Sequence, residues 1–272
     1  MDIKAFKMDG LGNDFIIVDR RKKSISIKKE KIIELGKRDN IGFDQLIFID
    51  EIDNITPSYN PITIYNSDGE KVEACGNGSR CVAKILCDQE KKGEAVIVTS
   101  NRVLKAQKIS ENNIRLEMGE PIFEWKKIPL SKDINHKKIN IKIDDLELKD
   151  GFAINVGNPH IVFFVDDCFK YDLKKIGPLI ENYELFPEKI NVTFAQIKDS
   201  SNILVNVWER GAGLTKACGT AACATGVVAF EKKLSINNTN IHFKEGLLNI
   251  EYNGLISMTG PVSNIKEIEI KL

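Results

Sequence analysis

The chain contains two copies of one short motif, one in each half. Residues 74–78 read A-C-G-N-G, and residues 217–221 read A-C-G-T-A. A stretch with helical spacing follows each copy. Self-similarity of this kind indicates an internal duplication and predicts two domains built on one plan. The length of 272 residues agrees with this, because single domains usually have about 100–200 residues.

Both halves show the same order of expected elements: strands, the motif, a buried helix and further strands. The apolar patterns predict helices at 28–38, 77–90, 173–183 and 222–234, and strands at 3–8, 15–18, 46–49, 62–65, 95–99, 103–108, 114–118, 151–156, 161–165, 192–197, 203–208, 247–252 and 255–259. Residues 119–140, with two prolines and mixed charges, mark the crossing between the halves.

We therefore predict an α+β fold of two structurally similar domains, with the active site in the cleft between them. Each domain is expected to be a mixed or antiparallel sheet wrapped around a central helix. The boundaries are 1–119 for the first domain and 120–260 for the second. A break is expected at Gly260-Pro261, and the alternation in 261–272 predicts a strand that returns to the first domain. The alternative is one large sheet protein, in which the second motif would be a coincidence.

Composition excludes several classes of function. The 39 basic and 39 acidic residues balance, so net charge gives no argument for nucleic acid or an anionic membrane as a partner. No apolar run approaches the roughly 20 residues that span a bilayer, and the N-terminus does not resemble a signal peptide. A cytoplasmic location is expected, where the six cysteines are thiols rather than disulfides. The spacings of Cys and His predict no metal site.

The two motifs each place a cysteine, Cys75 or Cys218, at a helix start. The unpaired N–H groups and the dipole there favour thiolate over thiol, so we expect the pKa of each sulfur to be lowered. Inverting a carbon that carries one acidic hydrogen needs a base on one face and an acid on the other. A pair of thiols can perform this reaction without a cofactor, and the amides of the helix starts can stabilise the developing charge. For either cysteine alone, a buried structural thiol is the alternative.

Other polar residues stand beside glycine-rich turns. Glu209 and Arg210 end a strand, and Arg210 offers a planar fork for a carboxylate. A surface ion pair is the alternative for these two charges. His160, in Gly157-Asn158-Pro159-His160, is placed to orient a thiol or exchange protons with it, although a lone histidine is more often structural.

Six motifs together resemble the diaminopimelate epimerase family. They are G-L-G-N-D-F (10–15), G-F-D-Q-L (42–46), N-S-D-G (66–69), A-C-G-N-G-S-R-C (74–81), G-N-P-H (157–160) and E-R-G-A-G-x-T-x-A-C-G-T (209–220). They stand in the family's order and cover most of the chain. The resemblance implies a cofactor-independent enzyme that interconverts LL- and meso-diaminopimelate, on the route to lysine and peptidoglycan.

The resemblance also implies the site residues. The catalytic positions match Cys75, Cys218, His160 and Glu209, and the substrate-binding positions match Asn13, Gln45, Asn66, Gly76, Asn77, Asn158, Asn191, Glu209, Arg210, Gly219 and Thr220. No metal and no cofactor are implied, and the partner is the small-molecule substrate, with no nucleic acid and no membrane. The sequence does not determine the oligomeric state, so a homodimer stays open.

Three positions depart from the family pattern. Asp9 stands where His is usual, Leu214 where Glu is common, and Ala221 where Gly usually follows C-G-T. Leu214 removes a carboxylate that would anchor its loop. Two other functions remain open: a proline or hydroxyproline racemase, which a His in place of Asn77 would favour, and a non-catalytic amino-acid-binding protein of the same fold.

Overall fold

A computed structural model describes residues 2–52, 58–72, 75–144 and 146–271. The chain divides into two compact units. Unit 1 consists of residues Met1–Glu117 and Thr259–Leu272, and unit 2 consists of Met118–Met258.

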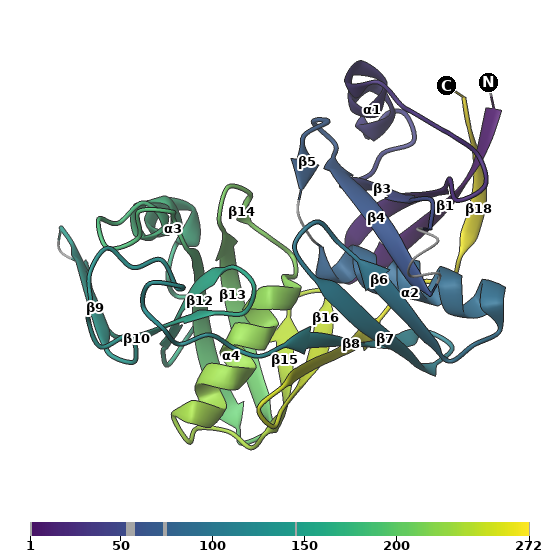
Figure 1. Cartoon of the computed structure of the whole chain (residues 1–272). Coiled ribbons are helices and arrows are strands. Elements are labelled where there is room, and N and C mark those ends of the chain that lie inside the picture. Colours follow the sequence, from purple (N-terminus) through teal and green to yellow (C-terminus); the bar gives the residue numbers. More distant parts are fainter. Residues whose placement is uncertain (1, 53–57, 73–74, 145, 272) are drawn as a thin grey trace. The chain divides into compact units, whose positions relative to one another are not determined.

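Unit 1 is a mixed sheet with two helices. Its strands follow the order β18-β1-β2-β3-β4-β6-β7-β8, and β5 pairs with the end of β4. The elements are β1 (Asp2–Gly10), β2 (Asn13–Asp19), α1 (Lys29–Gly36), β3 (Gln45–Ile49), β4 (Tyr59–Asn66), β5 (Lys71–Val72), α2 (Gly76–Glu90), β6 (Glu94–Val98), β7 (Val103–Ser110), β8 (Asn113–Gly119) and β18 (Lys266–Lys271). Because β1 and β18 are hydrogen-bonded, the two chain ends lie together (Figure 1).

Unit 2 has the same construction. Its strands follow the order β9-β10-β11-β12-β13-β15-β16, and β14 pairs with the end of β13. The elements are β9 (Ile139–Ile143), β10 (Leu146–Asn155), β11 (Pro159–Phe164), α3 (Leu173–Glu181), β12 (Asn191–Asp199), β13 (Asn202–Glu209), β14 (Gly213–Leu214), α4 (Gly219–Glu231), β15 (Asn238–Phe243) and β16 (Gly246–Tyr252). The chain passes from one unit to the other within β8 and again within β17 (Ile256–Pro261).

The strand directions repeat from unit to unit. The pair β2–β3 is parallel, and so is β11–β12. One strand before and one strand after each central helix in the sequence also pair in parallel: β4 with β6, and β13 with β15. The other neighbours in both sheets are antiparallel, including β1–β18 and its counterpart β10–β9. The predicted α+β fold of two similar units is therefore confirmed.

The helices that follow the two motifs are buried in their own units. In Figure 1, α4 lies against β15 and β16. It is apolar on all sides, which is typical of a helix surrounded by other elements. Gly226 lets α4 approach β16, because a Cβ there would lie 2.8 Å from Cγ2 of Ile250. In α2 even Arg80 and Lys84 are buried, and Lys84 Nζ donates to Asp88 Oδ2 at 3.0 Å and to Glu111 Oε1 at 2.7 Å.

The break expected at Gly260-Pro261 is observed, because β17 ends at Pro261 and β18 begins at Lys266. The buried helix expected after the first motif is observed as α2, in which every residue from Asn77 to Cys87 is buried. The strands β5, β9, β14 and β15 were not predicted.

Candidate active site

The first thiol, Cys75, is the N-cap of α2. Its backbone is extended, with φ −145° and ψ 112°, and its Sγ accepts a hydrogen bond from the Gly78 N–H at 3.4 Å. An N–H donor at a helix start stabilises negative charge on sulfur. The amides of Gly76 and Asn77 are first-turn amides, which a helix leaves without intrahelical partners. They are suited to bind an anionic group.

A chain of hydrogen bonds leads from the buried Arg80 to the surface at Asp44. Arg80 Nη2 donates to Asn77 Oδ1 at 2.9 Å, Asn77 Nδ2 donates to Asn13 Oδ1 at 2.7 Å, and Asn13 Nδ2 points to Asp44 Oδ2 at 3.4 Å. Because a guanidinium only donates and a carboxylate only accepts, the two ends set the orientation of both amides between them. Arg80 was not among the predicted site residues, although the motif at 74–81 contains it, one turn after Asn77 on the same helix.

Gln45 and Asn66 form a pair at the edge of the same sheet. Gln45 Nε2 donates to Asn66 Oδ1 at 3.0 Å, and the two residues are register partners on β3 and β4. Gln45 Oε1 is buried and has no hydrogen-bond partner in the described part of the chain. Asn13 begins β2, the parallel neighbour of β3, so all three amides lie at one edge of unit 1.

The second thiol, Cys218, is the N-cap of α4 and is only 4% exposed. Its Sγ lies 3.4 Å from Thr220 Oγ1. Burial raises the pKa of Cys218 well above its usual value, and the carboxylate of Glu209 raises this pKa further. The expectation that the helix start lowers this pKa is therefore wrong, because the loss of water around the sulfur outweighs the favourable dipole.

Glu209 lies beside Cys218 at the end of β13. Burial raises the pKa of the Glu209 carboxyl, while its hydrogen bond with Cys218 acts in the opposite direction. Both groups thus lose water, which disfavours two negative charges at this place. Glu209 and Cys218 can share a proton.

His160 is fully buried on β11. Its Nε2 lies 2.9 Å from Asn158 Oδ1, and since a carbonyl oxygen only accepts, Nε2 carries the proton. Burial lowers the pKa of His160 to about 3, and the charge of Arg210 adds to this effect. The imidazole is therefore neutral at pH 7, and its buried Nδ1 has no hydrogen-bond partner among the described residues.

Asn191 connects the His160 segment to the loop after β13. Its Nδ2 donates to the Pro159 carbonyl at 2.7 Å, and its Oδ1 accepts from the Arg210 N–H at 2.9 Å. The guanidinium of Arg210 is exposed, and its Nη1 donates to the Glu188 carbonyl at 2.9 Å. Asn191 thus braces the backbone in this structure, whereas Arg210 keeps further donors available.

The predicted site residues occupy matching places in the two units. Asn13 and Asn158 stand at the start of β2 and just before β11. Gln45 and Asn191 begin β3 and β12, Asn66 and Glu209 end β4 and β13, and Cys75 and Cys218 cap α2 and α4. The register brings each set to one edge of its sheet.

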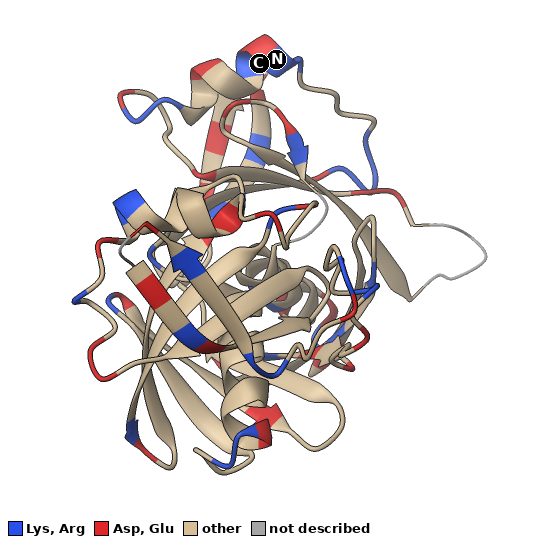
Figure 2. Ribbon diagram, turned by 90° about the vertical axis from the view of Figure 1, so that its left-hand side faces the viewer, with Lys and Arg blue, Asp and Glu red and all other residues tan. Residues whose placement is uncertain are grey.

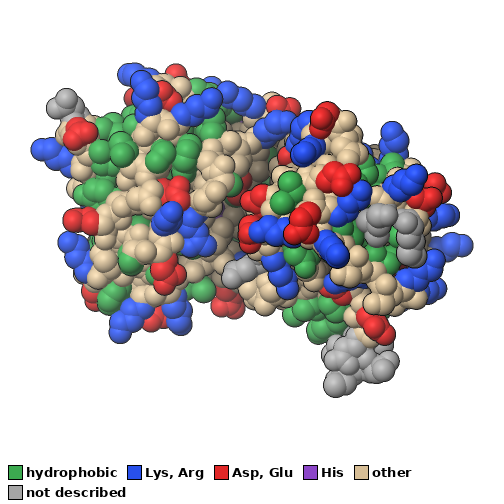
Figure 3. Space-filling model, turned by 90° about the horizontal axis from the view of Figure 1, so that it is seen from above, with side chains coloured by type: hydrophobic (Ala, Val, Ile, Leu, Met, Phe, Trp, Pro, Cys, Tyr) green, Lys and Arg blue, Asp and Glu red, His purple; other side chains and the backbone are tan. Residues whose placement is uncertain are grey.

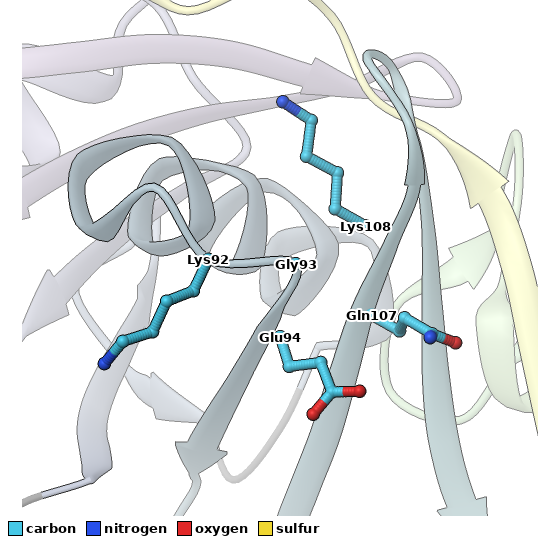
Figure 4. Close-up of a pocket in the computed structure, with 5 residues that line it drawn as sticks. All are labelled: Lys92, Gly93, Glu94, Gln107 and Lys108. Atoms are coloured by element: carbon cyan, nitrogen blue, oxygen red, sulfur yellow. The ribbon is translucent and has the colours of Figure 1, made fainter.

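A shallow hollow lies away from these residues, in unit 1. It measures about 420 Å³, is lined by residues 92–94, 107 and 108, and contains no predicted site residue. Figure 4 shows Lys92 and Lys108 pointing away from each other, so their charges do not converge on one ligand. Acidic and basic positions are interspersed along the ribbon (Figure 2). They are also interspersed over the face of the molecule that Figure 3 shows.

Within the described ranges, no group of three or more ligating His, Cys, Asp or Glu side chains gathers. None of the described helices has the length and apolar character needed to cross a membrane.

Solved structures share this fold. A phenazine biosynthesis protein of the PhzF family from Bacillus anthracis superposes with a TM-score of 0.69 at 15% identity and covers 100% of both chains. A probable proline racemase from Agrobacterium radiobacter K84 gives a TM-score of 0.68 at 12% identity, over 99% of this chain and 93% of the racemase. These similarities define the class of fold, two related α+β units.

Sequence relatives identify the family. The family model described as diaminopimelate epimerase matches residues 5–124 and 152–265. The diaminopimelate epimerase of Pelagibacter ubique (strain HTCC1062) is 50% identical over 100% of both chains. That of Zymomonas mobilis is 39% identical over 97% of this chain and 96% of the relative. The chain belongs to the diaminopimelate epimerase family, and it is an isomerase that acts on amino acids.

Proposed function

We propose that the protein interconverts LL- and meso-diaminopimelate without a cofactor: one sulfur, as thiolate, removes the α-proton, and the other, as thiol, donates a proton to the opposite face. The observation that carries this proposal is the matched position of Cys75 and Cys218 as helix N-caps in two units of the same topology. The full-length identity to named diaminopimelate epimerases supports the choice of substrate. On this proposal the two units are the two epimerase domains, and the enzyme works in the cytoplasm, in the supply of lysine and peptidoglycan precursors.

The roles follow from the surroundings of each group. Cys218 has a raised pKa and therefore holds its proton at rest, which suits an acid. After turnover Glu209 passes a proton from solvent to the Cys218 thiolate, while Cys75 releases the abstracted proton to solvent. Cys75, with the Gly78 N–H on its sulfur, acts as the base. The first-turn amides of α2 and α4, at Gly76, Asn77, Gly219 and Thr220, bind the carboxylate at the reacting carbon. Neutral His160 orients Asn158, and Arg210 with the remaining amides binds the distal amino-acid group.

The test is proton exchange in D₂O with LL- and meso-diaminopimelate. We expect Cys75→Ala and Cys218→Ala each to lower the rate of epimerisation by at least about 10²-fold, the usual contribution of one acid or base. Each variant keeps one thiol, which returns a proton only to the face it left. Cys218→Ala, which keeps the proposed base Cys75, should therefore incorporate deuterium into one epimer without inverting it.

Cys87→Ala, in the same helix as Cys75, is the matched control and should leave epimerisation unchanged. Full epimerisation by either of the two thiol variants would refute the two-thiol mechanism. Racemisation of proline in a parallel assay, with no turnover of diaminopimelate, would instead assign the chain to the racemase class. Absence of deuterium uptake in the wild type with every substrate would support a binding protein.

A further inference from the structure

Glu181, at the end of α3, is a buried carboxylate outside the proposed catalytic groups. It is 5% exposed and accepts two hydrogen bonds: from Trp208 Nε1 to Oε2 at 2.7 Å, and from the Gly211 N–H to Oε1 at 3.1 Å. Lys189 Nζ lies 3.8 Å from Oε1. A buried carboxylate is stable only when such partners replace its water.

In the sequence, the residues that carry the two donors flank Glu209 and Arg210. Trp208 directly precedes Glu209, and Gly211 directly follows Arg210. Register partners Glu209 and Gly213 close these residues into a tight hairpin, in which Gly211 has a φ of +75°. One carboxylate on α3 therefore binds both sides of the turn that carries Glu209 and Arg210.

The Trp208 ring is itself held in place by the packing of α3 against β13. A Cβ on Gly177 would lie 2.5 Å from Cδ2 of this ring, so the ring occupies the space that any other residue would need. The indole can therefore deliver its N–H to Glu181 from one fixed position. Asn191 Oδ1 adds a third attachment at the Arg210 N–H.

We propose that Glu181 is a positioning residue that holds the Glu209–Arg210 turn in its reactive geometry, which rests on the proposed epimerase function. An acceptor-only group is required, because both donors point at it. A displacement of about 1 Å in such a turn is enough to lower the rate of a reaction about 10²-fold.

The experiment is Glu181→Gln, which keeps the shape but turns one of the two acceptors into a donor. We expect kcat/KM for LL-diaminopimelate to fall by about 10–100-fold, with kcat reduced through Glu209 and KM raised through Arg210. Amide hydrogen exchange at Gly211 should become faster. Glu184→Gln, at an exposed position, is the matched control. It should leave kcat, KM and the rate of amide exchange at Gly211 unchanged.

A double-mutant cycle with Arg210→Ala distinguishes positioning from general stabilisation. If Glu181 acts through the turn, its substitution raises KM much less when Arg210 is already absent, while the loss of kcat through Glu209 remains. Additive rises in KM, or a lowered melting temperature with unchanged kcat/KM of the folded protein, would overturn the inference. Failure of the wild type to epimerise diaminopimelate would overturn the proposed function and the reactive role with it, whereas unchanged exchange at Gly211 would overturn the anchoring alone.

Discussion

At the scale of single residues, the surroundings of the two thiols differ although their motifs match. Cys75 is half-buried and receives an N–H, whereas Cys218 is buried beside a carboxylate. The motif alone predicts the same helix-start effect for both. Burial separates them, since desolvation depends on everything that packs around the sulfur.

This asymmetry predicts different reactivity toward iodoacetamide, an electrophile that thiolates attack and neutral thiols do not. We expect Cys75 to be alkylated first at pH 7. The pKa of Cys218 is raised, so its thiolate fraction stays small at neutral pH and its alkylation should accelerate only in alkaline buffer. Peptide mass spectrometry after timed labelling measures both rates. Burial raises the pKa of Cys168 to about 11, which makes this cysteine an unreactive reference. Equal rates for Cys75 and Cys218 at pH 7 would contradict the assignment.

At the scale of elements, strongly patterned segments were predicted within a few residues. The helix expected at 77–90 is observed as Gly76–Glu90, and the strand expected at 192–197 as Asn191–Asp199. The strand β15 was missed because its sequence begins N-T-N, which has little intrinsic preference for a strand. It forms because β13 and β16 offer hydrogen-bond partners on both sides, and a window of local sequence does not contain those partners.

The contact between α4 and β16 gives a prediction at this scale. Gly226→Ala gains about 1 kcal/mol of helix propensity but places a Cβ 2.8 Å from Ile250, and overpacking costs about 1–3 kcal/mol. We expect a net loss of roughly 0–2 kcal/mol in the free energy of unfolding of unit 2, measured by urea denaturation. Gly93→Ala is the control, because a Cβ there meets no atom within 4 Å. A stabilised Gly226→Ala protein would show that the helix can move away at little cost.

At the scale of the whole molecule, the two units complete their sheets by different routes. The partner of β10 is β9, which directly precedes it, whereas the equivalent partner of β1 is β18, from the other end of the chain. Ile270 of β18 belongs to the core of unit 1 and is 1% exposed. The folding of unit 1 therefore depends on a strand, β18, that is far from β1 in the sequence.

Substitutions in β18 should consequently weaken unit 1 selectively. We expect Ile270→Ala to lower the free energy of unfolding of unit 1 by about 2–5 kcal/mol, the usual range for a buried isoleucine. The readout is hydrogen exchange of β1 to β3, with β12 of unit 2 as the internal reference. Glu269→Ala, exposed on the same strand, should have little effect. Equal acceleration in both units would mean that they unfold together.

The amino-acid sequence by itself determined the duplication, both helix-start thiols and the turn residues of the site, because these features are local and each motif contains its own geometry. Tertiary structure alone decided that burial raises the pKa of Cys218, how Arg80 and Asp44 orient Asn13, and that Glu181 binds both sides of the Glu209–Arg210 turn. These properties depend on desolvation and on hydrogen bonds between residues distant in the chain. Neither is present until the sheet has formed.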